Sequence, residues 1–448
     1  MTRNRYRAAP LITPKMPPAI PYLISNEAAE RFSYYGMRAI LVVFMTEYLL
    51  THDGVHDVMG EVEARTYFHL FALVVYLSPA MGALIADVFW GKFRTIVTLS
   101  IVYCLGHFML ALDHTRIGLV TGLTLIAIGS GGIKPCVSAN LGDQFGSANS
   151  HLITKAFYWF YFAINLGAGI STLATPWLLK HYGPQFAFGL PGLLMLVATW
   201  VFWLGRWQYA HIPPKGLGFL KELVKRESLQ AMLRLAPIYL FVAFFWALYD
   251  QTGSAWVLQA KKMDRLWLGI EWLPSQIQVV NPFLIMLLIP VFSYVIYPVI
   301  HTVFPLTPLR KIGMGFFVTV VAFVLVAEIE TQISMGLRPN IVWQLFAFVV
   351  ITAAEVMVSI TCLEFSYTQA PKPLKSFVMA LFLLSVSLGN AFTSFVNYFI
   401  QNEDGTNKLA GAAYYWFFVG VMLVVSMVFV FVAKSYKGKT YVQGEEDE

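Results

Sequence analysis

Near its start the chain reads Glu27-Ala28-Ala29-Glu30-Arg31-Phe32-Ser33-Tyr34-Tyr35-Gly36-Met37-Arg38 inside a segment that is otherwise apolar. The length and hydrophobicity of that segment predict a membrane-spanning helix. A charged side chain at bilayer depth is costly, so it indicates a functional site that faces protein or a water-filled cavity. With a turn of about 100° per residue, positions 27, 30, 31, 34, 35 and 38 fall on one side of the helix.

The composition identifies the class of protein around this helix. The chain has 448 residues, of which 58% are hydrophobic and only 12% are charged. Soluble domains are about 25% charged, so the deficit and the repeated apolar runs indicate an all-α membrane protein with many spans. The net charge of +6 comes from basic residues spread over short loops, which does not predict nucleic-acid binding. The three cysteines lie in apolar runs and no Cys/His cluster has metal-ligand spacing, so neither a metal site nor a cofactor is expected.

We predict twelve spans in two six-helix bundles, residues 1–206 and 233–448, joined by a cytoplasmic linker at 207–232 that is rich in Pro, Gly and Lys. Lys and Arg are concentrated in the loops that would then be cytoplasmic, which places both termini inside the cell. Two such halves favour a secondary transporter with its site near the midplane. The spans are expected at about 20–50, 65–90, 93–112, 118–142, 152–180, 186–206, 233–260, 275–298, 308–329, 341–369, 374–401 and 411–434.

The charges at membrane depth differ between the halves. The first half contributes Glu27, Glu30, Arg31, Arg38 and Lys134, with His69 in the second span; the second half contributes Asp250, Glu355 and Glu364. A cavity between the halves would be positive on one wall and negative on the other, which suits a zwitterion. A peptide of two or three residues fits such a field, since an extended chain spans ~3.3–3.6 Å per residue.

The charges of the first span have two interpretations. Glu27 and Arg31 are spaced i,i+4 and could form a purely structural ion pair. The second carboxylate, Glu30, and the second guanidinium, Arg38, favour a functional site instead. A buried carboxylate that faces a movable cation can bind and release a proton, which is the physical requirement for proton coupling.

Other polar residues in the spans also leave alternatives open. Lys134 either finds a carboxylate on another helix or extends its ammonium to the interface, and His69 either titrates or is a hydrogen-bonded packing residue. Glu355 and Glu364 are nine residues apart, so a regular helix puts them on opposite faces. We therefore expect Glu364 in the cavity and Glu355 in packing or a gate. Asp250, beside Gln251, is interpreted as functional.

Single amides and aromatic residues complete the candidate site. Asn165 and Asn281 lie in apolar spans, and Asn281 precedes a proline, which exposes backbone carbonyls that can help to bind a ligand. The aromatic residues that share faces with the charges are Tyr34, Tyr35, Tyr76 and Trp246.

Several of these segments resemble the proton-dependent oligopeptide transporter family of the major facilitator superfamily. The stretch from Glu27 to Gly36 is similar to the family signature ExxERFxYYG, and residues 157–167, FYWFYFAINLG, resemble its fifth-helix motif. Residues 245–254 and the run Glu364-Phe-Ser-Tyr367-x-x-Ala-Pro371 resemble its seventh- and tenth-helix segments. The matches occur in the family's order. The residues in several of these segments, and His69 in the second span, are similar to those of the animal-type members.

The resemblance implies a role for each position. Glu27, Glu30, Arg31 and Lys134 would couple to protons, together with His69 and Asp250, and Asp250 would pair with Arg38 to close the outward gate. Arg38 and Lys134 would face the carboxylate of the peptide. Its amine would be held by Glu364 with Asn165 and Asn281, and the aromatic residues would contact its backbone and side chains.

Some features depart from the family pattern. The linker is too short for the two extra helices of many bacterial members, and no large extracellular domain separates the ninth and tenth spans, unlike animal members. Phe382 stands where the eleventh helix often has Trp, which would change side-chain selectivity.

The sequence thus predicts a proton-coupled symporter that imports di- and tripeptides by alternating access, with peptide-like drugs as further candidate ligands. It is expected to be a non-enzyme that functions as a monomer in the plasma membrane, or in the inner membrane of a bacterium. Alternatives are transport of another solute such as nitrate or a glycoside, a membrane enzyme, and a receptor that binds without transport. The acidic second half argues against a simple anion, and no nucleophile–base set or paired-Asp motif supports an enzyme.

Overall fold

The computed structural model describes residues 6–214, 216–218, 225–369, 375–401 and 407–436, and these residues are predominantly helical. The chain divides into two compact units. Unit 1 comprises Met1–Met59 and Val74–Lys221, and unit 2 comprises Gly60–Leu73 and Glu222–Glu448. Helix α2, Glu61–Ile85, is shared, because the contacts of its first half group with unit 2 and those of its second half with unit 1.

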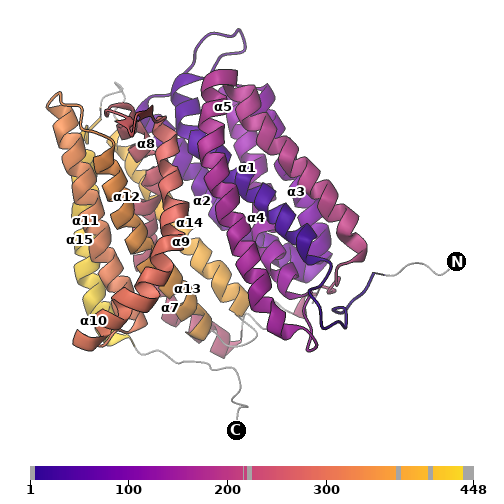
Figure 1. Ribbon diagram of the computed structural model, residues 1–448. Helices are drawn as coiled ribbons and strands as arrows, with labels where there is room; N and C mark the ends of the chain where they lie inside the picture. Colours follow the sequence, from indigo (N-terminus) through magenta and orange to yellow (C-terminus); the bar gives the residue numbers. More distant parts are fainter. Residues whose placement is uncertain (1–5, 215, 219–224, 370–374, 402–406, 437–448) are drawn as a thin grey trace. The chain divides into compact units, whose positions relative to one another are not determined.

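Unit 1 is built on long apolar helices. They are α1 (Ile20–Glu47), the second half of α2, α3 (Lys92–Leu112), α4 (Arg116–Gly142) and α5 (Ile153–Leu204). A π-helical turn, Ala86–Trp90, extends α2. Helix α1 lies alongside α5, and α3 packs against α4 and α5 (Figure 1).

Small residues allow these helices to approach closely. The carbonyl of Gly36 in α1 accepts a hydrogen bond of 2.9 Å from the Thr175 hydroxyl in α5. A Cβ added to Gly36 would lie 2.7 Å from a methyl carbon of Thr175, and one added to Gly167 would lie 2.6 Å from the Ala28 carbonyl oxygen. Helix pairs in membranes use such small residues to bring backbones together, and here they fix the charged face of α1 against α5.

Helix α5 contains a sharp kink. Gly183 has φ 80° and ψ −179°, which is not helical, and Pro184 follows it. Glycine adopts positive φ without steric cost, and proline is favoured in the first turn of a helix. The kink therefore separates two helical segments that correspond to the fifth and sixth predicted spans.

Unit 2 contains the remaining elements, which begin with α7 (Arg226–Tyr249) and α8 (Ala255–Lys261). A short hairpin follows, β1 (Leu266–Trp267) and β2 (Ile270–Glu271), whose two turn residues Leu268 and Gly269 both have positive φ. The later helices are α9 (Val280–Val291), α10 (Tyr297–Val303), α11 (Pro308–Ser334), α12 (Val342–Glu355), α13 (Thr361–Gln369), α14 (Lys375–Ile400) and α15 (Ala412–Ser435).

Two π-helical turns interrupt long helices of unit 2. Phe292–Ile296 joins α9 to α10, and Val356–Ile360 joins α12 to α13. A π-helical turn inserts one residue into the helix and is frequently found at functional sites. Both turns contact one apolar cluster, which includes Ile285, Phe292, Val356 and Met357.

Ten helices among the described residues are long and apolar enough to span a membrane. Helix α1 is not among them, although it has 28 residues, because it carries several charged side chains. Helix α5 is one of these ten helices, as part of the continuous stretch Ser150–Trp207. The kink at Gly183 nevertheless divides it into two segments. Twelve spans remain a prediction, which requires α1 and both segments of α5 to cross the bilayer.

Gly389 in α14 provides a test of the close packing in unit 2. A Cβ at this position would collide with the Ala243 carbonyl oxygen of α7 and lie 2.7 Å from the Ala247 nitrogen. We expect Gly389→Ala to lower the thermal midpoint of the detergent-solubilised protein, because overpacking typically costs ~1–3 kcal/mol. Gly420→Ala in α15 is the matched control, since nothing lies within 4 Å of its added Cβ. Equal midpoints for the two variants would contradict this account.

Candidate functional site

The carboxylates of α1 are closed off from solvent and share one guanidinium. Glu27 and Glu30 have 0% exposure. Arg31 Nε lies 2.6 Å from Glu27 Oε1 and 3.2 Å from Glu30 Oε2. Oε2 of Glu27 and both oxygens of Glu30 accept no hydrogen bond within the described part of the chain. Two negative groups and one positive group therefore occupy a space with little other polar compensation.

Lys134 of α4 is held by aromatic rings. Its Nζ lies 3.7 Å from the centroid of Tyr34 and 5.1 Å from that of Tyr76 in α2. Its charge also interacts with Glu27 and Glu30. Cation–π contacts with these two tyrosine rings support an ammonium group at this buried position. The structure thus brings together Glu27, Glu30, Arg31, Lys134, Tyr34 and Tyr76 within unit 1.

The remaining candidates of unit 1 lie on α1 and α5. Arg38 is buried two turns beyond Arg31 on the same face, and the half-buried ring of Tyr35 packs edge-on against Tyr34. Asn165 of α5 is buried and its Nδ2 donates a 2.9 Å hydrogen bond to the Tyr161 carbonyl of the same helix. Its amide orientation is therefore fixed by the backbone.

In unit 2, His69 and Asp250 are joined through an amide. Asn390 Nδ2 lies 2.6 Å from Asp250 Oδ2, and Asn390 Oδ1 lies 2.7 Å from His69 Nδ1. The other ring nitrogen, Nε2, lies 2.9 Å from the Ser254 hydroxyl. His69 and Asn390 have 0% exposure and Asp250 has 1%. This chain of hydrogen bonds runs through residues 321 and 140 positions apart in the sequence.

The direction of these hydrogen bonds follows from their ends. An ionised carboxylate only accepts, so the Asn390 NH₂ group faces Asp250 and its oxygen faces His69. His69 Nδ1 then carries a hydrogen and donates it to Asn390. In a neutral imidazole Nε2 accepts from Ser254, and after protonation it donates to the same hydroxyl. A change of role at Nε2 would therefore require the Ser254 hydroxyl to turn.

Asn390 was missed in the sequence analysis. Its sequence signal is a lone amide in the apolar run Leu388-Gly389-Asn390-Ala391-Phe392. That signal is weak, because a single Asn in a span is commonly a packing residue. Only the approach of α14 to α2 and to the end of α7 shows that it links two candidate residues.

The other candidates of unit 2 form separate contacts. Asn281 Nδ2 donates to Glu355 Oε2 at 2.7 Å and to Thr352 Oγ1 at 3.1 Å. The buried indole of Trp246 packs edge-on against Phe382, 6.4 Å away between centroids. Asn281 and Glu355 thus belong to one polar pair, while Phe382 packs beside an aromatic residue that we expect at the substrate site.

A regular helix would put Glu355 and Glu364 on opposite faces, but the helix between them is not regular. The π-helical turn Val356–Ile360 adds one residue, which reduces the angle between the two positions from about 180° to about 80°. Glu355 turns to Asn281, whereas the exposed Glu364 side chain lines a cavity of about 550 Å³ with residues of α9, α10 and α11.

Comparison with known proteins places the chain in a family. A model of the POT family matches residues 93–226 and 217–417. Peptide transporter family 1 of Drosophila melanogaster is 38% identical over 367 residues, which are 71% of this chain and 48% of that protein. Solute carrier family 15 member 1 of Homo sapiens is 36% identical over 382 residues, 72% of this chain and 53% of that protein. The chain spans about half the length of the curated relatives it matches.

Solved structures agree with these matches. The crystal structure of an auto-inhibited POT family peptide transporter superimposes with a TM-score of 0.85 and 33% identity, over 96% of this chain and 99% of that one. The POT family transporter PepTSo gives a TM-score of 0.83 and 35% identity, over 94% and 99%.

Apolar helices, charges enclosed at span depth and this shared fold define a membrane transport protein of the major facilitator class. Within that class the chain belongs to the POT family. The predicted fold class and family are confirmed, and the similar proteins named above are transporters rather than enzymes. The roles of the individual site residues stay predictions.

Asn390→Ala tests the hydrogen-bonded chain of unit 2. The substitution removes the partner of both His69 Nδ1 and Asp250 Oδ2, and an unsatisfied buried polar group costs ~1–3 kcal/mol. We expect a lower thermal midpoint and an altered pH dependence of uptake. Ser426→Ala is the control, because that buried hydroxyl donates to the Met422 carbonyl of its own helix and has no other hydrogen-bond partner among the described residues. A pH profile for Asn390→Ala that matches the unmodified protein would rule out the link.

Proposed function

We propose that this chain is a proton-coupled symporter that imports di- and tripeptides by alternating access. The observation that carries the proposal is the pair of enclosed carboxylates, Glu27 and Glu30, that share the Arg31 guanidinium in a span. Two of the similar proteins named above are peptide transporters, which supports the substrate class.

Proton coupling follows from the charge balance of this group. With both carboxylates ionised, one negative charge lacks a full counter-charge in a region from which water is excluded. Binding of one proton removes that excess, and so does the approach of a cation such as Lys134. Proton uptake at Glu27 or Glu30 would therefore release Lys134 to interact with a substrate carboxylate. The chain His69–Asn390–Asp250 supplies a second group that can accept a proton.

The substrate assignment rests on the charges that each unit carries by itself. In unit 1, Arg38 and Lys134 suit a carboxylate, and in unit 2, Glu364 suits an amine. The orientations of Asn165 and Asn281 agree with this assignment, because both amides donate to protein through Nδ2. Each amide thereby keeps its oxygen, which is the atom that accepts from an ammonium group.

The finer features predicted from the sequence remain parts of this proposal. They are the bipolar substrate site, the proton as coupling ion, peptide-like drugs as ligands, a functional monomer, the plasma or inner membrane, and cytoplasmic termini.

The proposal is tested by uptake of dialanine into proteoliposomes under an inward proton gradient. Glu30→Gln keeps the shape of the side chain but cannot ionise, so we expect gradient-driven accumulation to fall to the level of passive equilibration. Counterflow of labelled dipeptide, which needs no gradient, should persist. Glu328→Gln is the control, since Glu328 is an exposed carboxylate on α11. Full accumulation by Glu30→Gln would contradict the coupling assignment, and no uptake by the unmodified protein would contradict the function.

Glu364→Gln tests the binding of the substrate amine. We expect its dissociation constant for dialanine to rise about tenfold, since a hydrogen bond to a charged group contributes ~1.5–3 kcal/mol. N-acetyl-dialanine has no ammonium group, so its weaker binding should not change. Isothermal titration in detergent measures both constants. An equal loss for the two peptides would indicate a structural effect rather than amine recognition.

A further inference from the structure

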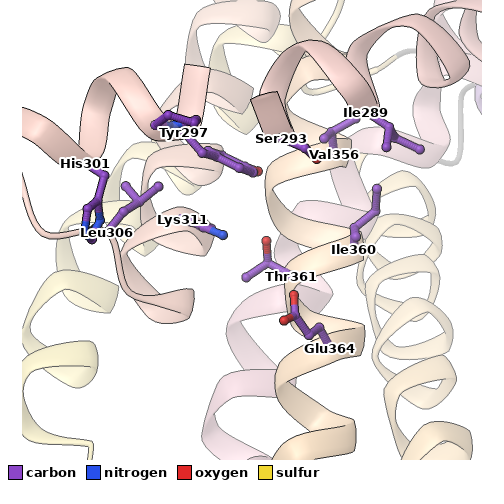
Figure 2. Close-up of a pocket in the computed structure, with 11 residues that line it drawn as sticks. Ile289, Ser293, Tyr297, His301, Leu306, Lys311, Val356, Ile360, Thr361 and Glu364 are labelled. Atoms are coloured by element: carbon purple, nitrogen blue, oxygen red, sulfur yellow. Dashed lines mark hydrogen bonds between the residues drawn. The ribbon is translucent and has the colours of Figure 1, made fainter. Parts of the chain in front are cut away.

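The cavity beside Glu364 contains a cation that the sequence analysis did not include. Its eleven lining residues, all of which belong to unit 2, are Ile289, Ser293, Tyr297, Pro298, His301, Leu306, Lys311, Val356, Ile360, Thr361 and Glu364. Lys311 is the fourth residue of α11, and Glu364 lies in α13. Figure 2 shows both side chains directed into the same space, from different helices.

Neither charge is neutralised by the part of the chain that the structure describes. Lys311 Nζ lies 4.3 Å from the ring centroid of Tyr297, a contact that supports the ammonium without cancelling its charge. No ion pair or side-chain hydrogen bond of Lys311 or Glu364 occurs among the described residues. A charged side chain in a spanning protein needs a partner or water, so both groups are suited to bind an external one.

The remaining lining defines the chemistry of the ligand. Hydroxyl groups of Ser293, Tyr297 and Thr361 provide hydrogen bonds, while Ile289 and Val356 provide apolar surface. A volume of about 550 Å³ lies within the ~300–1,000 Å³ typical of small-molecule sites. One ammonium, one carboxylate, several hydroxyls and an apolar surface match a short zwitterionic peptide.

We infer that Lys311 is a second binding partner for the peptide carboxylate and that, with Glu364, it forms a peptide-binding position contained within unit 2. This inference rests on the proposed function and deepens it. Glu364 is also the predicted partner of the substrate amine, so Glu364 and Lys311 together would hold the two ends of one peptide within unit 2.

A phosphatidylethanolamine headgroup is the other zwitterion that could occupy the cavity. The peptide is the ligand that the proposed function already requires, and its amide group can form hydrogen bonds with the three hydroxyl groups. The experiment must therefore distinguish binding of a peptide from binding of this lipid.

Lys311→Gln and Lys311→Arg are tested by titration with dialanine and with dialanine amide, which has no carboxylate. We expect Lys311→Gln to weaken dialanine binding about tenfold and to leave the amide unchanged, while Lys311→Arg restores binding. Arg310→Gln is the matched control, because it removes a neighbouring charge whose guanidinium contacts Phe304 and the Pro305 carbonyl and does not line the cavity.

Three results would overturn the inference. Unchanged dialanine binding by Lys311→Gln would exclude Lys311 as a carboxylate partner, and equal loss for dialanine and its amide would indicate a structural effect. If Lys311→Gln instead removes thermal stabilisation by phosphatidylethanolamine relative to phosphatidylcholine in nanodiscs, with dialanine binding unchanged, the ligand is a lipid. In each case the unmodified protein still binds dialanine, so the failure is distinct from a failure of the proposed function, in which it does not bind at all.

Discussion

The enclosed ion group of α1 constrains the structure of unit 1. Two carboxylates and one guanidinium can lie at span depth only if neighbouring helices exclude lipid and supply polar or aromatic partners. Helix α5 approaches closely enough for this because Gly36 and Gly167 leave room for Thr175 and for the backbone of α1. Helix α4 completes the surroundings by placing Lys134 over Tyr34. The packing of three helices is thus adapted to one charged face.

Unit 2 uses a different solution to the same constraint. Two of its charges are connected to neutral groups: buried Asp250 is bound to Asn390, and half-buried Glu355 is bound to Asn281. A side-chain amide can donate a hydrogen bond to a carboxylate and accept one at its oxygen. It therefore links two polar groups without adding a charge. This arrangement suits His69, whose protonation state can change while its neighbours keep their hydrogen bonds.

Irregular helices line the cavity of unit 2. The π-helical turn at Val356–Ile360 lies between Glu355, which binds Asn281, and Glu364, which lines the cavity. A second π-helical turn, Phe292–Ile296, precedes Tyr297 on the opposite wall of the same cavity. The same cavity has an exposed carboxylate, Glu364, and an ammonium group, Lys311, among its lining residues.

The sequence by itself determined the class of protein and the family, and it predicted the spans and most of the candidate residues. These properties depend on hydrophobicity and on short motifs such as that from Glu27 to Gly36, which are local. Tertiary structure alone decided that Asn390 joins His69 to Asp250, that Asn281 binds Glu355, and that Lys311 shares a cavity with Glu364. The reason is physical: partners far apart in sequence are chosen by helix packing, and a one-residue π insertion changes a helix face without changing the hydrophobic pattern that sequence analysis detects.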